Sequence, residues 1–507
     1  MIILAMLTLW LCLGSLALDA SRPHVASSAR ADMGAGMSSK AGVIGGGVGG
    51  LVVARNLAEA GFETTLIEAN AELGGRMNSF KVLHSLGEFR FDTGPSLLLL
   101  PNIYRQTLGQ DSGVEMLMVD PFYRVYFEGE EARPVDLEAV EGAIEETLLR
   151  QIDPDRTLKN VDKAFRRYKR IADSFLTFGL PAVIQETFPG WKEFVNFLGA
   201  AIEAFPLFSH DTMIRDVFGL SKEEEIVDSF QWSPGKKLRA LLSFQDLYVG
   251  LAPSKTPAVF SLLQALEYSQ GIYYPRGGFK TIAESLENSA IKAGVHIKKE
   301  TTVTSLVMSP TRNGMSRNVK SMMLSDFDGH DEIEVEVDCV VSNVDVPYAE
   351  SSSLLREVRV AAAEGCDLTP VGDKLTPSPP TNCDYSEGRA RKAIPSCSVI
   401  SLHLGFDCDL SRVFQHHTLF LSPLIASSWS NAEEDGGKFN PEYGINFYVH
   451  APKRTDKSAC PDGCDAITIL VPVRPPHPRF LPPSGVNLTP ISIYIASILC
   501  IAYLSIA

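Results

Sequence analysis

Four residues near the start of the chain have the types and spacing needed to hold a dinucleotide. Gly45, Gly47 and Gly50 follow the short apolar run 42–44 in the spacing G-x-G-x-x-G. Such glycines permit a tight turn, close approach of the backbone to a pyrophosphate, and close helix–strand packing. The helix start that follows offers free N–H groups to the phosphates. Glu68 comes eighteen positions after Gly50, where a carboxylate accepts hydrogen bonds from an adenosine ribose.

The residues around these glycines predict a strand, a helix and a second strand. Apolar residues recur at helical spacing from Leu51 to Ala58. Gly61 predicts the end of the helix, because glycine adopts the left-handed conformation that ends many helices with the least strain. Thr64–Ile67 is β-branched and apolar, which places Glu68 at the carboxyl end of a strand. A glycine-rich turn in an ordinary βαβ unit would explain the glycines alone, but it would not explain the acidic residue.

A further motif, E-L-G-G-R at Glu72–Arg76, follows soon afterwards. Together with the glycines and Glu68, it resembles the opening of a large flavoprotein group that contains amine oxidases and carotenoid desaturases. This resemblance implies FAD as the cofactor, with Gly75 and Arg76 near its pyrophosphate. A guanidinium suits that place because it can fork onto phosphate oxygens. The resemblance also implies that the backbone of Val303 contacts the adenine.

Later segments narrow the resemblance to carotenoid enzymes. The segment F-D-T-G-P-S at Phe91–Ser96 is similar to one beside the flavin of bacterial-type carotenoid desaturases. Leu238–Gly250 and Gly271–Gly278 resemble the central region of bacterial-type phytoene desaturases, and S-N-V-D at Ser342–Asp345 is similar to the family's S-N-A-D. The resemblance implies an α/β fold, in which a Rossmann-like FAD-binding domain carries an inserted α+β substrate domain and a helical membrane or substrate subdomain.

The chain of 507 residues is long enough for two or three domains. The predicted order is a signal peptide (1–20), a transit-like segment (21–40), the first part of the FAD-binding domain (41–130), a helical substrate domain (131–270), the return to the FAD-binding domain (271–346), the second part of the substrate domain (347–473) and an atypical proline-rich, apolar tail (474–507).

The N-terminal segments predict a destination. Met1–Leu18 is uncharged and apolar and is followed by small residues, which is typical of a signal peptide. Ser21–Lys40 is serine-rich and basic with a single acid, as in transit peptides. Together they predict entry into a plastid through the secretory route, with a membrane-associated protein there. Plain secretion and an N-terminal membrane anchor are the alternatives.

The resemblance stops at Val473. The family's final motif, roughly G-x-x-x-x-P-G-x-G, cradles the ribityl chain and the flavin ring, and it has no counterpart in residues 474–507. The uncharged stretch Ile491–Ala507 is only marginally long enough for a membrane anchor. We interpret the tail as out-of-frame or intron-derived sequence, because the switch cuts through a domain that needs its last strand and helix.

Composition excludes some classes of function. A net charge of −15 argues against nucleic acid as a partner, while a local apolar surface could still contact a membrane. The nine cysteines include no C-x-x-C pair, so no metal site is predicted. The pair His416–His417 is isolated in the sequence, and we predict that it lies in a loop.

Desaturation removes a hydride and a proton from adjacent carbons. No side chain accepts a hydride, so the flavin must, while the protein supplies position and a dry site. The resemblance implies an FAD-dependent desaturase acting on phytoene or a related carotene at a plastid membrane surface, with a quinone or oxygen as electron acceptor. A prolycopene cis–trans isomerase that uses reduced FAD and a truncated, non-catalytic pigment-binding protein are the alternatives. The sequence assigns no catalytic acid or base.

Overall fold

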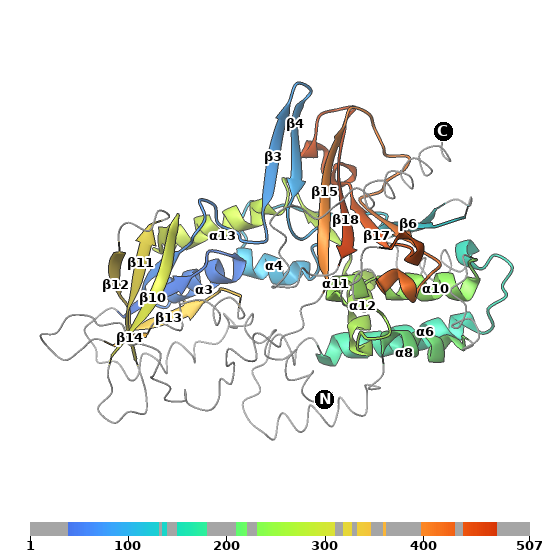
Figure 1. Cartoon of the computed structure of the whole chain (residues 1–507), viewed down its shortest axis with the longest axis horizontal. Helices are drawn as coiled ribbons and strands as arrows, with labels where there is room; N and C mark the ends of the chain where they lie inside the picture. Colours follow the sequence, from blue (N-terminus) through green and yellow to red (C-terminus); the bar gives the residue numbers. More distant parts are fainter. Residues whose placement is uncertain are drawn as a thin grey trace, which may run out of the picture.

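The structure is a computed structural model that describes residues 39–130, 134–138, 150–179, 209–220, 231–309, 318–326, 332–345, 358–360, 397–430 and 440–473. The predicted signal peptide, the predicted tail and almost all of the transit-like segment lie outside these residues. In the described part, a parallel sheet with two helices lies at one end of the molecule, and a larger mixed sheet with a group of helices lies at the other (Figure 1).

The predicted strand–helix–strand unit is present. β1 (Lys40–Ile44) leads into α3 (Val48–Glu59), and β2 (Glu63–Ile67) lies parallel to β1. The sheet is completed by β13 (Cys339–Ser342) beside β1 and β9 (His296–Lys298) beside β2, all parallel. Helix α3 packs along α13 (Lys280–Lys292) on one face. All four strands therefore end at one edge, where parallel sheets bind their ligands.

A second sheet covers the other face of the parallel sheet. Its strand order is β12-β11-β10-β14, with β10 at Thr301–Ser309, β11 at Asn318–Asp326, β12 at Glu332–Glu336 and β14 at Val358–Val360. Ile44 and Ile67 of the parallel sheet bury their side chains against Val303 and Met322 of this second sheet.

The β-branched pattern of Val335–Val341 predicts a single strand, and this prediction is wrong. The structure has two strands there, because the chain crosses between the two sheets at Val337–Asp338. The N–H of Val337 donates to the carbonyl of Lys320 in one sheet, and the N–H of Asp338 donates to that of Lys40 in the other. Both flanking runs are β-branched, so the sequence pattern continues through a change of sheet.

The larger sheet is mixed, with the strand order β15-β18-β17-β16-β6-β7. Its strands are β6 (Tyr123–Phe127), β7 (Val135–Leu137), β15 (Ser398–Phe406), β16 (His417–Leu421), β17 (Phe447–His450) and β18 (Asp465–Val473). β6 comes from residues 41–130, the predicted first part of the FAD-binding domain, yet it pairs with β16. That part of the chain therefore contributes to both sheets.

The two faces of this sheet differ in character. Phe447 and Val449 point to one face, which is an apolar core. Tyr448 and His450 alternate with them and point to the other face. There His450 lies opposite His417 of the neighbouring strand β16. Alternation along the strands therefore gathers polar, buried side chains on a single face of the sheet.

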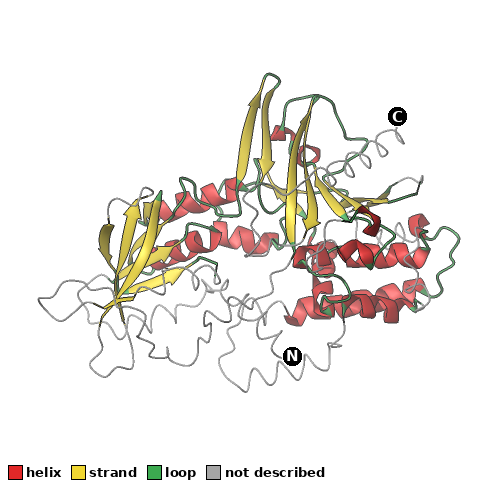
Figure 2. Ribbon diagram, in the orientation of Figure 1, coloured by secondary structure: helices red, strands yellow, loops and turns green. Residues whose placement is uncertain are grey.

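A group of helices lies beside this sheet in Figure 2, and their residues share a core with Tyr448 and Leu421 on the polar face. The helices are α6 (Val161–Ser174), α8 (His210–Phe218), α10 (Pro234–Ser243), α11 (Asp246–Val249) and α12 (Leu262–Gln270). Ser233 caps α10 by accepting from the N–H of Lys236, and Pro234 occupies the first turn, where its missing N–H is not needed.

A buried histidine joins three of these helices. His210 Nδ1 lies 2.9 Å from Asp246 Oδ1, and its Nε2 lies 2.8 Å from the hydroxyl of Tyr168. Tyr168 and Phe175 belong to the aromatic residues of the predicted helical domain, and both are buried in the core. Residues 180–208 of that predicted domain lie outside the described part. Within the described part, no helix combines the length and the apolar character that crossing a bilayer requires.

A hairpin of β3 (Ser79–His84) and β4 (Gly87–Asp92) rises beside β15 between the two ends of the molecule (Figure 1). β5 (Met116–Met118) and β8 (Tyr273–Pro275) form a small sheet nearby, and α4 spans Pro101–Leu108. The buried ion pair of Arg90 in β4 with Asp456, 2.6 Å apart, holds the hairpin against the loop before β18.

Candidate cofactor-binding and active site

The glycine loop leaves the positive end of α3 open. The helix begins at Val48, has Gly47 as its cap residue, and carries neither a side-chain hydrogen bond to its cap nor an acidic residue in its first turn. Its first N–H groups are therefore directed at an anion site. A Cβ at Gly50 would lie 1.9 Å from the carbonyl oxygen of Gly45, so the turn can close this tightly only on glycine.

Glu68 lies at the carboxyl end of β2, next to the glycine loop. Its Oε2 accepts a hydrogen bond of 2.7 Å from the N–H of Gly46, and its Oε1 accepts from the backbone and the side chain of Asn70. The residue is only 7% exposed. These bonds fix the carboxylate where the sequence predicts the ribose acceptor.

The Gly-Gly-Arg turn lies directly on the glycine loop. The N–H of Gly74 donates to the carbonyl of Gly46 at 2.9 Å. Gly75 has a φ of +57°, and a Cβ there would lie 3.2 Å from the Cα of Gly47. Two segments about thirty residues apart thus form one backbone cradle without side chains, which is suited to a pyrophosphate.

Asn343 and Asp345, which follow β13, complete this edge of the parallel sheet. Asp345 forms an ion pair with Arg76, whose side chain is 85% exposed. Asn343 packs against Gly49 in the first turn of α3, since a Cβ at Gly49 would lie 2.7 Å from its Oδ1. The sequence indicates these residues only through the resemblance, and it does not predict their place in the site. Their position at the end of a strand beside β1 was the available signal.

Val303 lies in β10, close to the same edge. Its side chain is buried, and the N–H of the nearby Thr301 donates to the carbonyl of Glu68 at 3.0 Å. A register shift between β10 and β11 follows Val303 directly. Contact between the backbone of Val303 and an adenine stays a prediction.

A cavity of about 170 Å³ lies between the end of β4 and the polar face of the larger sheet. Its lining residues are Asp92, Thr93, Gly94, Ser96, Val399, Ser401, His450, Thr468 and Leu470. The first four belong to the segment that resembles a flavin-side motif, and the others come from β15, β17 and β18.

Asp92 is already engaged on both oxygens. Its Oδ1 accepts from the hydroxyl of Ser79 and from the N–H of Phe279, and its Oδ2 accepts from the hydroxyl of Tyr274 at 2.6 Å. Burial raises the pKa of Tyr274 well above its usual value, so this phenol remains a donor. Asp92 therefore fixes the wall of the cavity.

Three histidines meet beside this cavity. The predicted loop is confirmed for His416, which lies in a bend, and is wrong for His417. His417 begins β16, and the rings of His416 and His450 lie 5.0 Å apart. All three are at most 2% exposed. Burial lowers the pKa of each imidazole, that of His450 to about 4, so all three are neutral near pH 7. The sequence did not reveal the cluster because His417 and its strand partner His450 are 33 positions apart in the chain.

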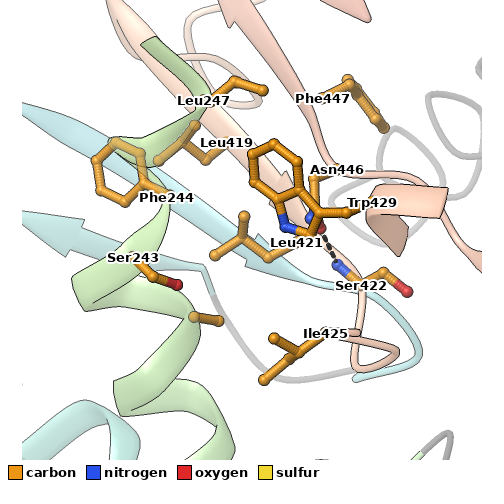
Figure 3. A pocket seen from close by; sticks show the side chains of 11 residues that line it. Ser243, Phe244, Leu247, Leu419, Leu421, Ser422, Ile425, Trp429, Asn446 and Phe447 are labelled. Carbon is orange, nitrogen blue, oxygen red and sulfur yellow. Dashed lines mark hydrogen bonds between the residues drawn. The ribbon is translucent and has the colours of Figure 1, made fainter. Parts of the chain in front are cut away.

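A smaller apolar cavity of about 20 Å³ lies further along the same face, next to α10. Figure 3 shows Phe244, Leu419, Leu421 and Trp429 around it, with the N–H of Ser422 bonded to the side chain of Asn446. This volume holds about one water molecule. The buried face therefore changes from polar at the first cavity to apolar at the second.

Residues 48–410 match the family model described as flavin containing amine oxidoreductase. The chain belongs to this family. The members of this family contain flavin, and FAD is the cofactor that the site fits. Gly45, Gly47, Gly50, Gly75 and Arg76 would hold its pyrophosphate, and Glu68 its ribose. An open helix end and a cradle that a Cβ would fill are the features of this structure that support the fit.

Curated relatives of this chain include carotenoid enzymes. The phytoene desaturase of Fusarium fujikuroi is 30% identical over 439 residues, covering 85% of this chain and 65% of that protein. The corresponding enzyme of Cercospora nicotianae is 28% identical, with 85% and 60% covered. The zeta-carotene-forming phytoene desaturase of Myxococcus xanthus is 28% identical, with 86% and 72% covered. The chain thus spans less than two thirds of the length of the fungal relatives.

Solved structures show the same fold. A protein of Pyrococcus furiosus superposes with a TM-score of 0.53 at 15% identity, covering 91% of this chain and 84% of that one. An oxidoreductase of Methanosarcina mazei has a TM-score of 0.50 at 16% identity, with 91% and 83% covered. The fold is accordingly a Rossmann-like FAD-binding fold with a second, mixed α/β part.

Proposed function

We propose that this chain is an FAD-dependent carotene desaturase that acts on phytoene or a related carotene. The relatives named above support the substrate class. The observation that carries the proposal is the cavity between the Asp92–Ser96 segment and the buried face of the larger sheet. It joins the flavin-side motif to a face that becomes apolar at Leu419 and Leu421, which suits an apolar polyene.

In this proposal each part of the chain has a physical task. Bound FAD supplies a two-electron acceptor that no side chain can replace. The glycine loop and Glu68 hold the adenosine and pyrophosphate end. Asp92, fixed by Ser79 and Tyr274, keeps the cavity wall in place, and the buried apolar wall excludes water. Excluding water protects the reactive site from side reactions.

The test is product analysis with the purified full chain loaded with FAD. Phytoene and poly-cis-lycopene are supplied separately, and the products are separated by chromatography. New conjugated double bonds in phytoene are expected, with the double-bond count of lycopene unchanged. Isomerised lycopene without desaturated phytoene would replace the proposal by the isomerase, and no product from either would indicate a non-catalytic pigment binder.

The proposal extends to location and partners. We place the protein at a plastid membrane surface, with a quinone or oxygen as its electron acceptor. The apolar and basic N-terminal segments of the sequence support this location. A fluorescent protein fused after residue 507 should enter plastids, and removal of residues 1–38 should keep it in the cytosol. Secretion of the fusion would contradict the location.

A further inference from the structure

We propose that His450 accepts the proton released in the reaction and passes it through His416 to Thr455 at the protein surface. This inference rests on the proposed function and names the proton acceptor that the reaction requires.

The geometry forms a continuous chain from the cavity outward. His450 lines the cavity. Its Nε2 lies 3.2 Å from Nε2 of His416, and Nδ1 of His416 lies 2.6 Å from Oγ1 of Thr455. Thr455 is partly exposed, whereas both imidazoles are buried. Each imidazole of the chain thus uses its two nitrogens as an entrance and an exit.

The free nitrogen of His450 is the entrance. Within the described part of the chain, no group hydrogen-bonds to Nδ1 of His450. If His450 carries its proton on Nε2 and donates it to His416, then His416 carries its own on Nδ1 and donates to Thr455. In this arrangement Nδ1 of His450, a residue that lines the cavity, has a free lone pair, as a base needs.

A second chain also leaves the cavity, but it ends inside the protein. Ser96 accepts from the hydroxyl of Tyr448 at 2.9 Å, and that hydroxyl lies 2.6 Å from Nδ1 of His417. Nε2 of His417 is buried and has no partner among the described residues. A proton that reached His417 would therefore have no onward acceptor, which leaves the route through His416.

The electrostatic surroundings suit a transient carrier. Burial keeps His450 neutral, while the negative charge of Asp92 acts in the opposite direction. Arg454 and the neighbouring imidazoles disfavour a lasting charge on His416. Arg90 and His403 also oppose a charge on His450. A proton that enters the chain is therefore not retained on either imidazole.

The step breaks two C–H bonds of the carotene. The hydrogen of the first bond leaves with both electrons as a hydride, which bound FAD would accept. The adjacent C–H bond breaks and leaves its pair as the new C=C bond, and its proton binds Nδ1 of His450. The proton on Nε2 of His450 then moves to His416, and the proton on Nδ1 of His416 leaves through Thr455.

The first test uses the flavin-free full chain and does not depend on activity. Nitrogen-15 NMR of histidine-labelled protein distinguishes the two neutral tautomers, and the loss of a signal in H416Q assigns it. We expect His416 with its proton on Nδ1, and a shift of this signal in T455V. His416 with its proton on Nε2 would overturn the inference, because His450 would then be a donor toward the cavity.

The second test measures the rate of flavin reduction by phytoene in a single anaerobic turnover. H416Q should slow it by at least about ten-fold, within the usual range for loss of acid–base assistance, with FAD content unchanged. H417Q, the control within the same cluster, should slow it less than about three-fold. Equal effects of H416Q and H417Q would contradict the route. If wild type leaves phytoene unchanged, the proposed function fails, while the NMR result still decides the tautomers.

Discussion

Nη2 of Arg76 lies 2.5 Å from Oδ2 of Asp345, although the two residues are 269 positions apart in the chain. The pair links the Gly-Gly-Arg turn to the loop after β13, on either side of the glycine loop. Both side chains are largely exposed, at 85% and 64%. Exposed ion pairs contribute little to stability, so a role for Arg76 would be in binding the cofactor.

Replacing Arg76 should therefore separate binding from folding. R76A should change the free energy of unfolding by less than about 1 kcal/mol and raise the dissociation constant of FAD by about ten-fold or more, the loss of one charge-assisted contact. R76K should have an intermediate dissociation constant, because lysine keeps the positive charge but cannot make the two parallel hydrogen bonds of a guanidinium. The control is D345N, which removes the ion pair with Arg76 and should not weaken FAD binding. An unchanged dissociation constant in R76A would contradict the phosphate role.

Gly50 tests the cradle itself. Because its Cβ would lie 1.9 Å from the carbonyl of Gly45, G50A should open the turn and abolish FAD retention through gel filtration. Gly113 has a φ of +70° and no atom near its added Cβ, so G113N should keep the flavin. Retention of FAD by G50A at the wild-type level would show that the loop does not hold the cofactor.

The buried pair of Arg90 and Asp456 should matter far more to stability. Burial alone would raise the pKa of Asp456, but hydrogen bonds from Gly277 and Ser458, together with Arg90, hold it below its usual value. D456N should cost about 3–5 kcal/mol, as expected when one partner of a buried pair is removed. E88Q breaks the exposed pair of Lys81 and Glu88 and should cost less than about 1 kcal/mol. Similar urea midpoints for the two variants would refute this ranking.

Glu267 predicts a pH dependence of stability. Burial raises its pKa to about 7, against the opposing hydrogen bonds from Tyr123 and Gln245. Between pH 4.5 and 7 the folded state thus binds more protons than the unfolded state. The stabilisation is complete below pH 4.5 and is lost as the pH rises through about 7.

The E267Q variant, which imitates the protonated acid, should lack this loss. Its free energy of unfolding relative to wild type should rise by about 3 kcal/mol from pH 4.5 to pH 8. Urea titrations at both pH values measure the difference, and E63Q, at an exposed glutamate, should follow the wild-type profile. A constant difference between E267Q and wild type would contradict the assignment.

The sequence predicted the dinucleotide half of the fold well because its signals are local. The glycine spacing, the helical period after it and Glu68 at a strand end lie within 30 residues, and each follows from backbone geometry. The site features that it missed depend on distant pairing. Asn343 and Asp345 reach the glycine loop because β13 lies beside β1, and His450 meets His416 and His417 because β17 pairs with β16.

The boundary between β12 and β13 also could not be predicted from local sequence signals. Val335 and Val341 belong to one β-branched run, so period and propensity give no sign that the chain changes sheets at Val337. Likewise, the position of β6 in the larger sheet follows from its pairing with β16, which no local pattern encodes. Tertiary pairing, rather than propensity, decides these elements.

The most direct test of the central claim is an anaerobic titration of the FAD-loaded full chain with phytoene, followed in the visible spectrum. We predict that the absorption of oxidised flavin falls as absorption of a longer conjugated polyene appears, with one new double bond for each flavin reduced. Bound flavin whose spectrum stays unchanged with phytoene present, or a folded chain that binds no flavin, would contradict the account.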